Sequence, residues 1–122
     1  MKMKEQSMKI LIPTFSTLEV VAADEIICIH AADSYSQVEL IKKKKITSTK
    51  GIGQFAKELE NQGFFQCHKS HLVNLSKLVR YHKEGQAEMV DGRLIPVARR
   101  RKEEFLDQIK QRGDFTNSNF KS

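Results

Sequence analysis

Residues 67–71, Cys-His-Lys-Ser-His, gather side chains of the kinds that bind metals or act as nucleophiles. Cysteine and histidine could bind zinc, and a cysteine or serine beside a histidine could attack a carbonyl. The spacing matches no common zinc motif, and the sequence shows neither an orienting third group nor an oxyanion site. Adjacent strand residues point to opposite faces, so Cys67 and His68 would diverge. We therefore expect no metal, no cofactor and no enzyme activity, with Cys67 as a small buried core residue.

The second group of candidate functional residues is basic. Lysines and arginines are concentrated in three stretches that contain no acidic residue. The chain has 21 lysines and arginines against 15 acidic residues, a net charge of +6. The acid-free stretches hold 14 of the basic residues: Lys42–Lys45 and Lys50 in 41–56, Lys69, Lys77, Arg80 and Lys83 in 66–83, and Arg93 and Arg99–Lys102 in 93–102. Brought together, they would bind a polyanion such as DNA, releasing counterions from its phosphates.

Two of these runs differ in how strongly they indicate an anionic partner. Lys42–Lys45 fits a hairpin tip, where lysines equally often serve solubility or guard a sheet edge. Arg99–Lys102 begins an expected helix, where the helix dipole disfavours cations. This second run therefore favours a nearby anion, although an incidental solvated face remains the alternative.

Length and composition exclude several classes of protein. The 122 residues suffice for one domain, and 39% hydrophobic residues allow a modest core. No apolar run approaches the ~20 residues of a membrane span, and no apolar segment follows the basic N-terminus as in a secretory signal. Two cysteines far apart, Cys28 and Cys67, do not make a disulfide framework. We therefore expect a cytoplasmic protein.

The hydrophobic pattern predicts the elements that must position these residues. Short strands are expected over 9–13, 17–21, 26–31, 37–41, 46–49, 64–67, 78–82, 87–90 and 93–96. The continuous apolar run 26–31 is typical of a strand buried on both faces. Helical spacing appears over 51–61 and again over 99–111. We predict a mainly β, compact single domain of mostly antiparallel strands over residues 8–111, with a polar leader (1–7) and a flexible tail (112–122).

The sequence from Phe64 to Leu75, FFQCHKSHLVNL, resembles the signature of the LytTR DNA-binding domain. In that family a strand runs into His, Arg or Lys, and Ser, followed by an aromatic residue, an aliphatic pair and Asn. Three further segments agree in the family's order: the strand and loop at 24–35, the helix at 52–59, and the closing hairpin with its arginines at 91–100. The resemblance covers roughly Ile10 to Ile109.

The resemblance implies a mainly β, bacterial, cytoplasmic transcription factor that contacts successive major grooves of DNA through loops. By position, these loops are 33–37, 69–71 and the segment around Arg99. From side-chain chemistry we expect base contacts from Arg99, Lys69, Ser34, Tyr35 and Ser36, and phosphate contacts from Arg100, Arg101, Lys102, Lys77, Lys50 and His71. Structural roles fall to His68, Ser70 and Asn74, with Asn74 bracing the turn after Ser70.

The chain departs from the family pattern at His71, where an aromatic residue is common, and at Ala98, where many members have serine. Most members carry an N-terminal receiver domain, so the chain fits either an excised output domain or a free-standing regulator with a receiver or sensor partner. By analogy we expect a monomer in isolation and a dimer on paired DNA repeats. The alternative is a module whose basic face binds an acidic protein; RNA binding is weaker, because few aromatics accompany the basic stretches.

Overall fold

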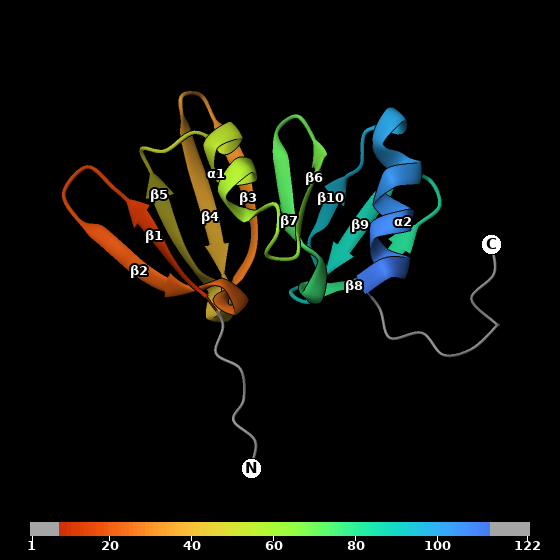
Figure 1. The fold of residues 1–122 in the computed structure, drawn as a ribbon, viewed down its shortest axis with the longest axis horizontal. Helices are drawn as coiled ribbons and strands as arrows, with labels where there is room; N and C mark the ends of the chain where they lie inside the picture. The colour runs from red at the N-terminus through yellow and green to blue at the C-terminus, as the bar shows by residue number, and fades with distance from the viewer. Residues whose placement is uncertain (1–7, 113–122) are drawn as a thin grey trace, which may run out of the picture.

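Ten strands in three antiparallel sheets form the framework of residues 8–112, which the computed structural model describes (Figure 1). A two-stranded sheet pairs β1 (Lys9–Pro13) with β2 (Leu18–Ala22). The central five-stranded sheet has the order β5 (Lys44–Ser48), β4 (Tyr35–Leu40), β3 (Ile26–Ala32), β7 (His71–Asn74) and β6 (Phe64–His68). The third sheet has the order β10 (Leu94–Pro96), β9 (Gln86–Met89) and β8 (Leu78–His82).

The helices are α1 (Ile52–Leu59) and α2 (Lys102–Arg112), and short 3-10 turns connect the strands. These turns are η1 (Ala23–Glu25), η2 (Ile41–Lys43), η3 (Leu75–Lys77) and η4 (Arg99–Arg101). The predicted mainly β fold with a mid-chain and a C-terminal helix is therefore confirmed. Two details differ: residues 71–74 form a strand that was not predicted, and residues 99–101 form a 3-10 turn ahead of α2. The expected leader and residues 113–122 of the tail lie outside the described residues.

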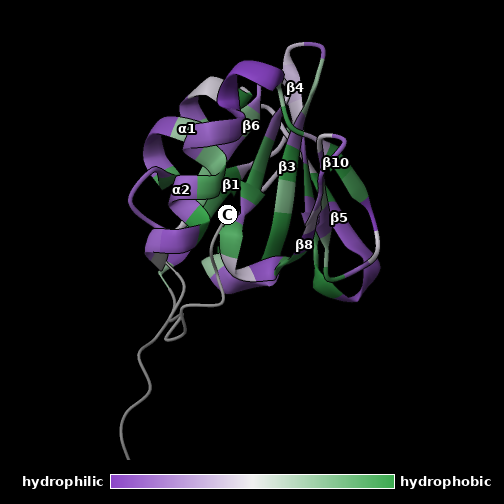
Figure 2. Cartoon of the chain, turned by 90° about the vertical axis from the view of Figure 1, so that its right-hand side faces the viewer, coloured by the Kyte–Doolittle hydropathy of each residue, from purple (hydrophilic) through white to green (hydrophobic). Residues whose placement is uncertain are grey.

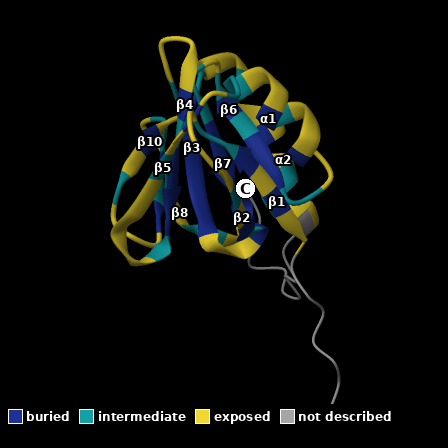
Figure 3. Ribbon diagram, turned by 90° about the vertical axis from the view of Figure 1, so that its left-hand side faces the viewer, coloured by how far each residue is buried: buried dark blue, intermediate teal, exposed yellow. Residues whose placement is uncertain are grey.

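Both faces of the central sheet are buried, and each face has its own hydrophobic core. The β1–β2 hairpin and α1 cover one face, where Ile12, Phe55 and Leu59 are fully buried. The three-stranded sheet and α2 cover the other, around Met89 and Phe105. Figure 3 shows the central strands buried between exposed turns, and Figure 2 shows polar residues on the outward faces of both helices.

A bulge in β3 lets this strand contribute to both cores. The pairing with β4 shifts between Ile26 and Cys28. Because the extra residue interrupts the alternation, Ile27 and Cys28 both enter the second core, whereas Ile26 and Ile29 enter the first. All four are at most 2% exposed, which confirms burial on both faces for 26–29, whereas His30 and Ala31 of the predicted segment are only half-buried.

Asn74 ties β7 to the start of β3 through a buried side chain. Its amide Nδ2 donates to the Ile26 carbonyl at 2.8 Å and to the Ala23 carbonyl at 3.4 Å. Its Oδ1 accepts from the Ser76 backbone N–H at 3.0 Å and from the Ser76 hydroxyl at 2.9 Å. The sequence placed Asn74 at the turn after Ser70. It instead caps η3, because β7 separates it from that turn.

Replacing this amide should therefore destabilise the fold. Asn74→Ala leaves a buried carbonyl and a backbone N–H without partners, and we expect a loss of about 2 kcal/mol in the free energy of unfolding. Ser76→Ala removes one exposed hydroxyl and serves as control, with an expected loss below about 1 kcal/mol. Urea titration followed by circular dichroism measures both. Equal losses in the two variants would contradict this role for Asn74.

Candidate functional site

Three turns lie side by side at one edge of the molecule, along the top of Figure 1. They are the β3–β4 turn (33–34), the β6–β7 turn (69–70) and η4 (99–101). The Ala31 N–H donates to the Ser70 carbonyl at 3.0 Å, and the Ala98 N–H donates to the Cys67 carbonyl at 2.8 Å. Main-chain hydrogen bonds thus fix the second turn to both others. We call this row of turns the loop edge.

Exposed cations that pair with no carboxylate in the described part of the chain project from the loop edge. Lys69, Arg99, Arg100 and Lys102 are all exposed. Among residues 8–112, their side chains form no hydrogen bond or ion pair. These groups are therefore available to an anion without first breaking an internal contact, which makes the edge a candidate polyanion site.

Lys83 joins this group, although the sequence did not single it out as a site residue. It lies in the β8–β9 turn. The Gly85 carbonyl of this turn accepts a hydrogen bond from the Val97 N–H at 2.9 Å, which holds the turn beside the segment before η4. An open hollow of about 410 Å³ is lined by Lys83, Glu84, Arg99 and Lys102 among others. The Glu84–Gly85 turn signal directly after Lys83 could have placed it at a strand end.

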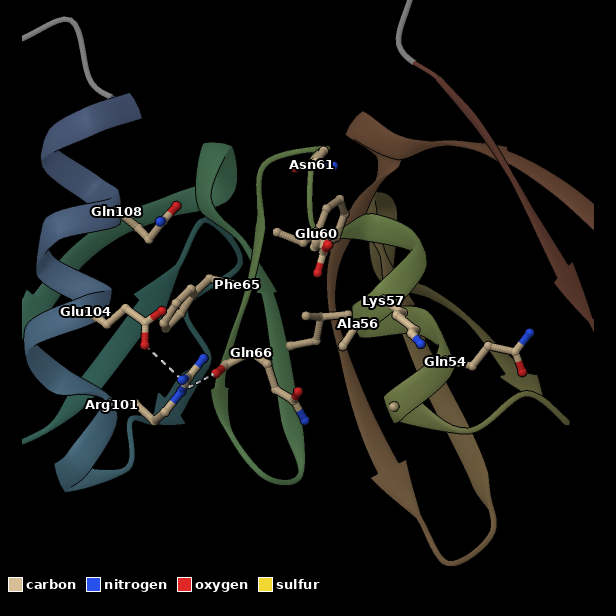
Figure 4. Close-up of a pocket in the computed structure, with 13 residues that line it drawn as sticks. Gln54, Ala56, Lys57, Glu60, Asn61, Phe65, Gln66, Arg101, Glu104 and Gln108 are labelled. Carbon is tan, nitrogen blue, oxygen red and sulfur yellow. Dashed lines mark hydrogen bonds and ion pairs between the residues drawn. The ribbon is translucent and has the colours of Figure 1, made fainter.

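Arg101 differs from its neighbours because its guanidinium is folded back onto β6. Nε donates to the Gln66 carbonyl at 3.0 Å, and Nη1 pairs with Glu104 Oε1 at 2.9 Å (Figure 4). The guanidinium also lies over the Phe65 ring, 4.7 Å from its centroid. Arg101 therefore holds η4 in place, and we remove it from the expected phosphate contacts.

The hollow in Figure 4, about 860 Å³, separates α1 from α2 beside β6. Its rim carries both signs of charge, with Lys57 and Glu60 on the α1 side and Arg101 and Glu104 on the α2 side. No cluster of metal-ligating side chains occurs in the described part of the chain. Burial raises the pKa of both Cys28 and Cys67 to about 12, so neither thiol supplies a thiolate near neutral pH.

Two residues expected to touch DNA are engaged inside the protein. Ser36 is fully buried, and its hydroxyl donates to the Lys50 carbonyl at 2.7 Å. The Lys50 ammonium pairs with Glu58 at 2.6 Å, donates to the Leu11 carbonyl and lies 4.7 Å from the Phe55 ring centroid. The structure therefore contradicts a base contact from Ser36 and leaves only 10% of the Lys50 side chain exposed for a phosphate.

The remaining lysines of the acid-free stretches lie away from the loop edge. Lys77 belongs to η3, which follows β7, and Lys42–Lys45 follow β4. Both strands begin at the loop edge and run away from it, so these lysines lie at the opposite end (Figure 1). The acid-free stretches are therefore not one continuous patch, and Lys77 is not part of the loop edge.

Three histidines meet where β3, β6 and β7 approach the loop edge. The His71 ring lies 5.1 Å from His68 and 6.0 Å from His30, centroid to centroid. His68 Nδ1 accepts the Ser70 N–H at 3.0 Å, and His30 Nε2 bonds to Glu39 at 2.9 Å. His71 Nδ1 is buried without a partner among the described residues. Burial, then the nearby His68 and His30, lower the pKa of His71 to about 4, so this ring is neutral at pH 7.

This depressed pKa predicts a pH dependence of stability. An unfolded histidine titrates near 6.5, and folded His71 titrates near 4. Between these values the unfolded chain binds more protons, so the free energy of unfolding should rise as pH increases from about 4 to 6.5. His71→Phe keeps a ring without the titrating group and should flatten that rise. Urea titrations across this pH range test it, and the same slope in both proteins would contradict it.

Comparisons with known proteins agree with this architecture. The sequence model of the LytTr DNA-binding domain matches residues 16–110. Among solved structures, a similar fold occurs in the LytTr DNA-binding domain of a Bacillus cereus protein described as a methyl-accepting/DNA response regulator. The two chains share 17% identity with a TM-score of 0.72, over 87% of this chain and 98% of that one. No curated protein matches the chain. None of the helices within residues 8–112 is long and apolar enough to cross a membrane.

Proposed function

The chain belongs to the LytTR DNA-binding domain family, and on that premise we propose that it binds specific duplex-DNA sites as a bacterial transcriptional regulator. In this proposal it is the output domain of a two-component response regulator, and the loop edge enters the major groove. The observation that carries the proposal is the row of exposed, unpaired cations whose backbone is fixed by main-chain hydrogen bonds.

Arg99 is the leading candidate for a base contact. Its side chain is exposed at the start of η4, and the hydrogen bond from Ala98 to Cys67 fixes the preceding backbone. An arginine held in this way can donate two hydrogen bonds to O6 and N7 of one guanine. Lys69 is the second candidate, with Ser34 and Tyr35 in the neighbouring exposed turn.

Phosphate contacts fall to the exposed cations around Arg99. Arg100 and Lys102 follow it in the chain, and Lys83 faces the same hollow. His71 does not fit this role, because a ring that titrates near 4 carries no charge for a phosphate at pH 7. Its partly buried ring instead packs between the other two histidines.

Paired DNA repeats complete the proposal, with one copy of the chain on each repeat and a monomer in solution. The first experiment is selection from a random duplex library with the full chain near physiological salt, followed by sequencing. A recovered motif, especially one repeated about one helical turn apart, supports sequence-specific binding. Salt-sensitive binding without a motif contradicts it and favours the alternative, an acidic protein partner for the same basic edge.

Arg99→Ala should lower specific binding selectively. We expect a loss of about 1–3 kcal/mol on the selected site and a much smaller loss on random duplex. Arg100→Ala is the matched control, because a phosphate contact weakens both duplexes alike. Fluorescence anisotropy at constant salt measures the four affinities. Equal losses on both duplexes would make Arg99 a phosphate contact.

Lys102→Ala should weaken binding to both duplexes and change the salt dependence. Each lost phosphate contact reduces the slope of log K against log salt by about 0.9. Lys44→Ala removes the same charge at the opposite end of the domain and should leave the slope unchanged. Titrations over several salt concentrations separate the two variants. A similar slope change in both would show that net charge, and not the loop edge, determines the affinity.

A further inference from the structure

The β1–β2 turn (14–17) also reaches the loop edge. The Pro13 carbonyl, at the end of β1, accepts the Thr49 N–H at 2.9 Å and the Ser48 hydroxyl at 2.8 Å. Ser48 ends β5 and pairs with Ser36 near the start of β4. Because β4 begins directly after the β3–β4 turn, the β1–β2 turn must lie beside that turn.

Phe15 occupies the tip of the β1–β2 turn and is 73% exposed. Its ring meets the Tyr35 ring edge to face, with centroids 5.2 Å apart and planes 69° apart. Leu11, Leu18 and Val20 on the same hairpin are also exposed, but Phe15 differs from them because its ring packs against Tyr35 beside the loop edge. Tyr35 is itself 37% exposed, so the pair presents an aromatic surface at the end of the row of turns.

Hydrogen bonds within the turn hold the backbone that carries Phe15. Thr14 Oγ1 accepts from the Thr17 N–H at 2.9 Å and from the Ser16 N–H at 3.2 Å. The Thr14 N–H donates to the Thr17 carbonyl at 2.8 Å, which closes the turn. A contact made by Phe15 therefore requires little further ordering of the chain.

The chemistry of this turn suits a base edge better than a phosphate. Thr14, Ser16 and Thr17 carry no charge, and the nearby Lys50 ammonium is already paired with Glu58. Asp33 in the adjoining turn is exposed and would repel a phosphate. In the major groove, the apolar group that a phenyl ring can contact is the C5-methyl group of thymine.

We propose that the β1–β2 turn is a fourth DNA-contacting loop, in which Phe15 packs against a thymine methyl group at the outer end of the binding site. In addition to its candidate base contact, Tyr35 positions the Phe15 ring. The inference rests on the proposed function and extends it to residue 15, which lies outside the 16–110 match to the family.

Replacing thymine by uracil tests the contact, because uracil lacks only the methyl group. Each thymine of the selected site is replaced singly, and the affinity of the full chain is measured by fluorescence anisotropy. We expect one outer position at which uracil weakens the wild-type chain by about 4-fold, the value of one buried methyl-sized group. Phe15→Ala should lose a similar factor on the thymine site and show no further loss with uracil at that position.

Matched variants separate the contact from a change in folding. Val20→Ala shortens an exposed apolar residue on the same hairpin and should leave the affinity and the uracil scan unchanged. Tyr35→Phe keeps the ring pair and should retain the uracil effect, whereas Tyr35→Ala should reduce it. Urea titration checks that each variant is folded. We expect Phe15→Ala to fold normally, because the Phe15 side chain is largely exposed.

The outcomes distinguish this inference from the proposed function. A motif without thymine at its outer end, or a uracil penalty that is the same with and without Phe15, would overturn the fourth loop alone. Loss of self-association in Phe15→Ala, with the uracil scan unchanged, would assign Phe15 to a protein contact and likewise overturn it. A library that yields no motif would overturn the proposed function, and the fourth loop with it.

Discussion

Burial of both faces of the central sheet is the constraint on which the rest of the structure depends. β3 meets it through its bulge, which sends Ile26 and Ile29 to one core and Ile27 and Cys28 to the other. A strand enclosed in this way cannot present charge along its length without a large desolvation cost. Within the central sheet, exposed cations are therefore found near strand ends and in turns, and antiparallel pairing brings several of those ends to the same edge.

Internal carboxylates divide the basic residues into those that build the fold and those that remain available. Arg93 pairs with Asp91 and Glu39. Burial alone would raise the pKa of Glu39, but His30 and Arg93 outweigh it and the pKa is lowered. Other structural cations include Lys50 with Glu58, Arg80 with Glu88 and Arg101 with Glu104. Within residues 8–112, the exposed cations Lys69, Arg99, Arg100 and Lys102 have no such partner, and that difference matters more than the net charge.

The sequence predicted the fold class and most strands because apolar periodicity records burial directly. It failed where the outcome depends on a boundary or on topology. The strand expected from Gln37 begins at Tyr35, so Ser36 points inward and bonds to Lys50. From the sequence, Arg101 could not be distinguished from Arg99 and Arg100. Its internal partner is the Gln66 backbone carbonyl, and every residue type carries such a carbonyl. Lys77 belongs to the same acid-free stretch as Lys69 but lies at the opposite end of the domain. This could not be seen from the sequence, because β7, which separates the two lysines, was not predicted.

Main-chain hydrogen bonds, which do not depend on side-chain identity, hold the turns of the loop edge at fixed distances from one another. The β6–β7 turn connects β6 and β7, and the β3–β4 turn follows β3, which pairs with β7 in the same sheet. Strand spacing in a sheet is about 4.8 Å whatever the side chains are. Under the proposed function, substitutions at turn positions would therefore alter which bases are preferred while the separation of the contacts stays unchanged. In that proposal, a new binding preference would arise from different side chains on turns whose spacing the backbone keeps constant.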